Sequence, residues 1–186
     1  MNDKMRNMSD TRPGAATSTR RLDEILRVDH AGELGAVRIY QGQLAVLRNS
    51  PAAGIVRQMA DQEQRHKALL DQLLNERGAR PSVLDPLWSA AGFALGAASA
   101  LLGEKAAMAC TVAVEDVIGA HYGRQAKEIE ASEPTLAAAL HQLKDEELEH
   151  LKTGLAEGAE KAPAYPLMSG LIKAGCRLAI KIAEKL

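Results

Sequence analysis

The sequence is poor in aromatic residues and in cysteine. Aromatic residues make up 3% of the 186 residues, and β-branched runs are few, so a β-sheet is not predicted. The two cysteines, Cys110 and Cys176, lie far apart in apolar stretches and form no Cys-x-x-Cys pair, which favours reduced core residues in a cytosolic-type environment. The chain also lacks a Gly-x-Gly-x-x-Gly fingerprint after a strand, so no Rossmann unit for a flavin or nicotinamide is predicted.

An excess of one charge and a long apolar run are also missing. The net charge is -1 and the two signs are mixed along the chain, which argues against a nucleic-acid partner. The uncharged stretch at residues 87–102 is shorter than the roughly 20 residues of a membrane span. Two interpretations of it remain open. It is either a buried crossover with the first turns of the next helix, or an element at a membrane interface, which Trp88 and Phe93 favour.

The composition instead indicates one all-α domain, because alanine and leucine are abundant and the length suffices to bury a core. Residues 1–21 show no apolar periodicity and are predicted to form a disordered tail. Asp3 and Asp10 argue that this tail is not a mitochondrial transit peptide. The helical domain is predicted at residues 22–186, divided into hairpin one (22–77), an apolar crossover (81–103), hairpin two (104–158) and a C-terminal helix (165–186).

The sequence contains two Glu-x-x-His pairs, Glu63/His66 and Glu147/His150, that indicate a metal site. Residues three apart on a helix share one face, so each pair presents two ligands in one direction. Glu33 lies 30 residues before Glu63 of the first pair, and Glu115 lies 32 residues before Glu147 of the second. Two hairpins with this pattern form the ligand set of a carboxylate-bridged di-metal site in a four-helix bundle. The predicted ligands are Glu33, Glu63, His66, Glu115, Glu147 and His150.

The turn signals support the two hairpins independently of the ligands. Antiparallel helices bring Glu33 and Glu63 to the same height only if the chain reverses near residue 48, where Asn49-Ser50-Pro51 ends one helix and starts another. The second hairpin needs a turn near residue 131, and Ser132-Glu133-Pro134 provides it. Solvated Glu–His pairs on helix surfaces are the alternative for the motif, but they do not require these matched turns.

Charge and donor type indicate the metal. Four buried carboxylates repel one another, whereas four glutamates and two neutral histidines balance two divalent ions. Carboxylate and imidazole donors suit two ferrous ions or manganese, and the thiolates that favour zinc are absent. By analogy with similar bundles, Glu63 and Glu147 are expected to bridge the ions, with Glu33 and Glu115 at the ends.

The C-terminal segment is predicted to be an amphipathic helix. An apolar stripe runs through it, and Lys173, Arg177, Lys181 and Lys185 recur every four residues on the other side. Such a helix can lie on an anionic membrane or pack on the bundle with a solvated basic face. Together with the uncharged stretch, it favours association with a membrane lipid surface.

Five segments also match a known family. They read RVDHAGELGAVRIYQGQ, MADQEQRH, ALLGEKAAMACTVAVEDVIGAHY, DEELEH and APAYPLMSGLIKAGCRLAI. Over roughly residues 22–186 the chain resembles the demethoxyubiquinone hydroxylases of ubiquinone biosynthesis, which belong to the ferritin-like superfamily. The resemblance implies a peripheral membrane di-iron monooxygenase that hydroxylates the ring of a demethoxyubiquinol with dioxygen. A ferritin- or rubrerythrin-like iron oxidase or peroxidase, and a non-catalytic membrane adaptor, are the alternatives.

The resemblance also implies roles for residues outside the ligand set. His121 and Tyr122 match a His-Tyr pair of the family and are predicted to act catalytically, near the metals or in electron or proton transfer. His30 either supports a ligand or is a core histidine, and Tyr40 and Tyr165 are interpreted as packing residues.

The electron donor has no motif of its own, so it is the quinol, NADH or a partner protein. A lipid-binding partner that presents the quinone, or a homo-oligomer, is compatible with the resemblance. The cytoplasmic face of a bacterial membrane is predicted in preference to the mitochondrial inner membrane, because an arginine-rich start is missing.

Overall fold

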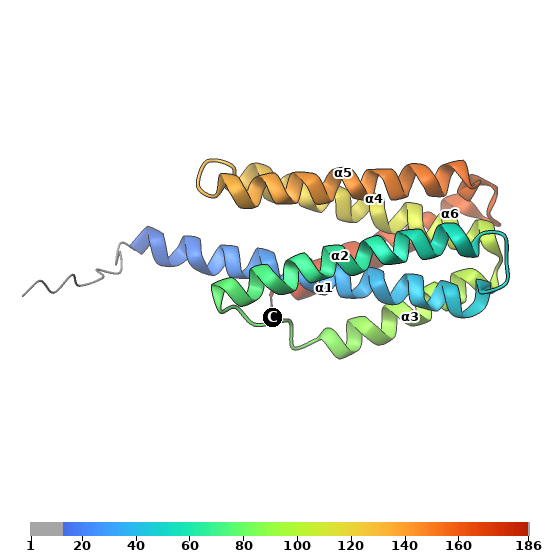
Figure 1. Cartoon of the computed structure of the whole chain (residues 1–186), viewed down its shortest axis with the longest axis horizontal. Coiled ribbons are helices and arrows are strands. Elements are labelled where there is room, and N and C mark those ends of the chain that lie inside the picture. Colours follow the sequence, from blue (N-terminus) through green and yellow to red (C-terminus); the bar gives the residue numbers. More distant parts are fainter. Residues whose placement is uncertain (1–12, 186) are drawn as a thin grey trace, which may run out of the picture.

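A computed structural model describes residues 13–185, and in this range the chain forms only helices and connecting turns. The elements are α1 (Pro13–Leu47), α2 (Ala53–Arg77), α3 (Asp85–Leu101), α4 (Glu104–Ile129), α5 (Pro134–Ala156), the 3₁₀ turn η1 (Ala159–Lys161) and α6 (Tyr165–Ala183). The predicted all-α four-helix bundle with two antiparallel hairpins is confirmed, with α1 and α2 in one hairpin and α4 and α5 in the other (Figure 1).

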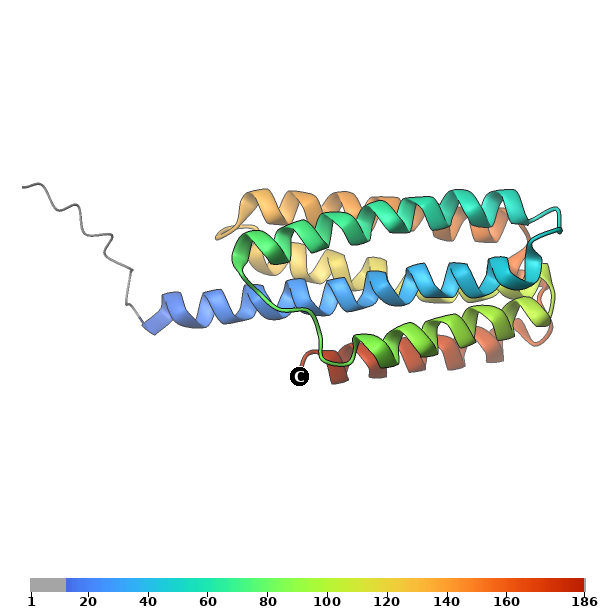
Figure 2. The same cartoon turned by 60° about the horizontal axis from the view of Figure 1, so that its bottom comes forward.

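The helices are arranged in three layers of two, which Figure 2 shows from the side. Helices α2 and α5 form one outer layer, α1 and α4 the middle, and α3 and α6 the other outer layer. The two halves of the chain therefore repeat one plan, in which a hairpin carries a third helix against its first helix. Because α1 and α4 are covered on both sides, α4 buries most of its residues between Ala106 and Val117.

Two predicted segments need correction. The prediction of a disordered tail is wrong for residues 13–21, which form the first turns of α1 and extend past the other helices in Figures 1 and 2; residues 1–12 lie outside the described range. Proline is suited to the first helical position and alanine favours helix, so residues 13–16 start a helix without apolar periodicity. Arg21 then anchors this part of α1, because its Nε and Nη2 atoms donate to Glu128 of α4 at 2.7 and 2.9 Å.

The interpretation of residues 87–102 as a buried crossover with the first turns of the next helix is also wrong. The uncharged stretch forms a separate helix, α3, which ends before Gly103, where a φ of 110° suits glycine. Glycines let α3 approach α1 closely: a Cβ atom on Gly96 would lie 1.9 Å from the carbonyl oxygen of Ile39. The opposite face of α3 is open, and Leu87 and Leu101 are 54% and 75% exposed.

Candidate metal centre

The structure brings all six predicted ligands together in the middle of the bundle. None of the six residues is more than 3% exposed, and they come from all four helices of the two hairpins. Apolar clusters lie on both sides of this polar layer along the bundle axis, with Met59 and Met108 in one and Leu70 and Leu140 in the other. The hydrophobic core thus closes the site off along its length.

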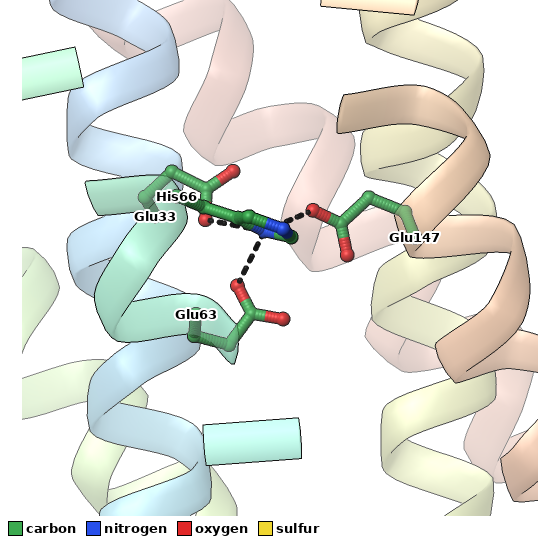
Figure 3. A group of neighbouring side chains, drawn as sticks. All are labelled: Glu33, Glu63, His66 and Glu147. Carbon is green, nitrogen blue, oxygen red and sulfur yellow. Dashed lines mark ion pairs between the residues drawn. The ribbon is translucent and has the colours of Figure 1, made fainter. Parts of the chain in front are cut away.

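The ligand atoms form two overlapping groups. Glu33, Glu63, His66 and Glu147 make the first group, shown in Figure 3, and Glu115 and His150 join Glu63 and Glu147 in the second. Within each group the candidate atoms lie within 4.8 Å of one another. Glu63 and Glu147 belong to both groups, which is the arrangement needed for two carboxylates that bridge two ions.

Both histidines direct Nδ1 at the carboxylates. The Nδ1 atom of His66 lies 3.0 Å from Glu147 Oε1, 3.6 Å from Glu63 Oε2 and 3.7 Å from Glu33 Oε2. The Nδ1 atom of His150 lies 2.8 Å from Glu63 Oε1 and 3.2 Å from Glu147 Oε2. Each imidazole therefore faces oxygens from both hairpins.

The donor atoms fit two divalent ions. Both oxygens of Glu63 and of Glu147, and the Nδ1 atoms of both histidines, are buried without an ordinary hydrogen-bond partner among the described residues. Buried polar atoms of this kind are costly unless a cation or hydrogen bond satisfies them. Oxygen and imidazole donors suit iron or manganese better than a metal that prefers thiolate ligands. Neither cysteine belongs to the site.

Protons and metals compete for these groups. Burial, with the charges of Glu63 and Glu147, raises the pKa of Glu33 and of Glu115 well above the usual range. Burial alone would lower the pKa of His150, but the nearby carboxylates of Glu147 and Glu63 raise it to about 10. The folded site thus holds protons at neutral pH, and metal loading must release them.

Two tyrosines support the end carboxylates in a reciprocal way. The Tyr40 hydroxyl of α1 donates to Glu115 Oε1 of α4 at 2.7 Å, and the Tyr122 hydroxyl of α4 donates to Glu33 of α1. The interpretation of Tyr40 as a packing residue is therefore incomplete. The signal was present in the sequence, because Tyr40 follows Glu33 by the same seven residues as Tyr122 follows Glu115.

His121 does not join the six ligands. Its Nε2 lies 3.6 Å from Oδ1 of Asp29, and its Nδ1 lies 3.3 Å from an Arg124 nitrogen that can donate to it. Burial and the neighbouring arginines lower the pKa of His121 to about 4, so the imidazole is neutral at physiological pH. Sequence reasoning missed Asp29, whose side chain is fully buried one helical turn before Glu33.

His30 connects helices rather than ligands. Its Nε2 is 2.8 Å from Asp71 Oδ1 on α2, and its Nδ1 is 3.6 Å from Asp85 Oδ2 in the first turn of α3. The shorter contact links α1 to α2, and the start of α3 lies beside it. Of the two roles left open for His30, the structure supports the core histidine, because the side chain is buried and its contacts are with Asp71 and Asp85 rather than with a candidate ligand.

An apolar groove lies on the α3/α6 side of the bundle. It has a volume of about 490 Å³, with α1 and α4 as its floor and α3 and α6 as its walls. Gly32 and Val114 line it, and each directly precedes a candidate ligand, Glu33 or Glu115. The groove therefore follows the helix turns that carry the two end carboxylates.

Comparisons with known proteins agree with this site. The family model described as ubiquinone biosynthesis protein COQ7 matches residues 20–183. The chain belongs to the COQ7 family. Its relatives include the 3-demethoxyubiquinol 3-hydroxylase of Rhodospirillum rubrum, which is 53% identical over 95% of this chain and 84% of the relative. NADPH-dependent 3-demethoxyubiquinone 3-hydroxylases named as mitochondrial are 49% identical in Mus musculus (88% of this chain, 77% of the relative) and 46% in Dictyostelium discoideum (88% and 77%).

Proposed function

We propose that this COQ7 family member hydroxylates the ring of a demethoxyubiquinol with dioxygen, in ubiquinone biosynthesis. The observation that carries the proposal is the buried cluster of four glutamates and two histidines in a chain about half identical to named hydroxylases. Glu33, Glu63, His66, Glu115, Glu147 and His150 hold two ferrous ions, which supply electrons to dioxygen when bound. The complete reaction inserts one oxygen atom and consumes two electrons and two protons to form one water.

The residues of the chain position the substrate and exclude water. The apolar groove takes the hydrophobic tail of the quinol between α3 and α6, and its floor directs the ring towards the turns of Glu33 and Glu115. Tyr40 and Tyr122 fix these two carboxylates by hydrogen bonds, while the apolar clusters on both sides keep bulk water out. Tyr122 and its neighbour His121 are proposed to serve proton or electron transfer at the Glu33 end of the site.

A nicotinamide nucleotide is the proposed electron donor. The mitochondrial relatives are named NADPH-dependent, and NADH is chemically equivalent as a source of two electrons. The given sequence has no Rossmann fingerprint, so no Rossmann unit within it is proposed to hold the donor.

Membrane association is proposed through the α3/α6 layer. Exposed leucines repeat along α6, where Leu167, Leu171 and Leu178 are 60–66% exposed. A run of exposed leucines on one helix is unusual for a surface that faces only water. Lys181 and Arg177 are exposed beside them. No helix in the described range is both long and apolar enough to cross a bilayer. The layer therefore lies on the lipid surface, where the quinol tail can enter the groove, on the cytoplasmic face of a bacterial membrane or an equivalent surface.

Replacing two exposed leucines of α6 tests this orientation. The double variant Leu167→Glu/Leu178→Glu should bind anionic lipid vesicles at least about tenfold more weakly, because two apolar side chains no longer enter the interface. Leu148→Glu is the matched control, since Leu148 is 42% exposed on α5, in the opposite layer. Lys181→Ala should weaken binding to anionic but not to neutral vesicles. Equal vesicle sedimentation of the leucine double variant and the control would contradict the proposed face.

The activity itself is tested with labelled dioxygen. Protein loaded anaerobically with iron is mixed with a short-tailed demethoxyquinol, NADH or NADPH, lipid and ¹⁸O₂, and the quinol is analysed by mass spectrometry. Hydroxylation should yield a product with one labelled oxygen atom. If iron is oxidised and dioxygen consumed while the quinol returns unlabelled, the chain is instead a ferritin- or rubrerythrin-like oxidase.

A further inference from the structure

The two halves of the metal centre differ at one pair of equivalent positions. In hairpin one the motif reads Gln62-Glu63-x-x-His66, whereas in hairpin two it reads Glu146-Glu147-x-x-His150. The residue before the glutamate that both ligand groups share is thus neutral in one half and acidic in the other. A site with two equal metal positions would have the same support for both histidines.

Glu146 crosses from α5 to the histidine of the other hairpin. Its Oε2 lies 2.7 Å from Nε2 of His66 and accepts a 2.8 Å hydrogen bond from Gln62, while Gln142 donates to its Oε1 at 2.8 Å. A carboxylate can only accept, so this contact places the His66 proton on Nε2 and leaves the lone pair of Nδ1 for the site. Both oxygens of Glu146 are held, which fixes the orientation of the His66 ring.

His150 has no equivalent support. Its Nε2 is buried, with no hydrogen-bond partner among residues 13–185. The amide of Gln62, which occupies the position equivalent to Glu146, donates to Glu146 instead. The imidazole of His66 therefore has an acidic partner on Nε2, and the imidazole of His150 has none on its Nε2.

We infer that Glu146 is a positioning residue that makes the two metal positions unequal, so that the one formed by Glu33, Glu63, His66 and Glu147 binds ferrous iron more tightly and fills first. The inference rests on the metal site of the proposed function. An acidic partner on the outer nitrogen increases the basicity of a ligating imidazole and holds its geometry, and loss of such a partner typically weakens metal binding about 10- to 100-fold. The position of His150 is the weaker one, and its ion exchanges more readily.

Calorimetric titration with ferrous iron under anaerobic conditions tests the inference on the full chain. The wild type should show two binding events with clearly different affinities. The isosteric Glu146→Gln should weaken the tighter event about 10- to 100-fold and leave the other nearly unchanged. Glu149→Gln is the matched control, because the substitution removes the same charge from the same helix. The Glu149 side chain is 68% exposed and pairs with Lys152 at 2.6 Å.

A spectroscopic readout separates this role from a general loss of structure. In protein loaded with Co²⁺, the paramagnetically shifted N–H proton of His66 should exchange with deuterium more slowly than that of His150, and Glu146→Gln should abolish the difference. Equal affinities in the wild type, or unequal affinities that Glu146→Gln does not change, would overturn the inference alone. Failure of the wild type to bind metal would overturn the proposed metal site and the inference with it.

Discussion

Glu147→Ala is expected to abolish iron loading and to lower hydroxylation at least about a thousandfold. Glu147 belongs to both groups of ligand atoms, so its loss removes an oxygen donor from each metal position at once. It also removes the carboxylate whose oxygens lie 3.0 Å from Nδ1 of His66 and 3.2 Å from Nδ1 of His150. A thousandfold loss corresponds to about 4 kcal/mol, which is modest for a donor shared by two ions.

The measurement is the iron content per chain after anaerobic loading, followed by the yield of labelled product. Glu149→Ala is the control, because it lies on the same helix with its side chain in solvent. Circular dichroism must show that both variants keep the helical bundle. A Glu147→Ala protein that retains two irons and normal turnover would show that the carboxylates of this layer are structural and that the metals bind elsewhere.

Local patterns in the sequence were sufficient to predict the hairpins and to place the ligands together. Residues three apart lie on the same face of a helix, so the two side chains of a Glu-x-x-His pair project in the same direction. The turns near Pro51 and Pro134 then fix the height at which the two helices of each hairpin meet. The alignment of the ligands within each hairpin follows because both constraints act over short distances and do not depend on how the hairpins dock.

Contacts between the hairpins could not be predicted in this way. Glu146 belongs to α5 but supports His66 of α2, and its partner depends on how the two hairpins are rotated against each other. The apolar neighbours of Tyr40 in the sequence predict a packing role, but they do not indicate where its hydroxyl points. The reciprocal spacing of Tyr40 and Tyr122 becomes informative only after the repeat is treated as a structural symmetry.

The structural repeat of the two halves of the chain includes the outer layer of α3 and α6, which was the hardest layer to predict from the sequence. Helices α3 and α6 occupy equivalent places against α1 and α4, yet they differ in how they pack. Glycines bring α3 into backbone contact with α1, whereas α6 presents half-buried residues such as Ile172 and Cys176 to the groove. The groove exists because the two helices lie against the middle layer and leave space between them.

Asp29→Asn is expected to change how stability depends on pH. Burial raises the pKa of Asp29 from 3.8 to about 8, and the neighbouring Gln125 and Arg21 offset this only in part. The neutral His121 beside it supplies no positive charge. Between these two pKa values the folded protein holds a proton that the unfolded chain has released. The stability of the wild type should therefore decrease as pH rises, by about 1.4 kcal/mol per pH unit for this group, until the carboxyl ionises near pH 8.

Asparagine cannot ionise, so Asp29→Asn lacks this slope. The free energy of unfolding is measured with urea from pH 5 to 9. The difference between the variant and the wild type should increase in favour of the variant by roughly 3 kcal/mol between pH 5 and 7.5, and should then stay constant. Asp23→Asn is the control, because Asp23 lies on the same helix with its side chain 33% exposed and paired with Arg77 at 3.2 Å. Its difference from the wild type should stay nearly constant. Parallel curves for Asp29→Asn and the wild type would mean that Asp29 ionises in the folded bundle as it does in water, and that a counter-charge reaches it beside His121.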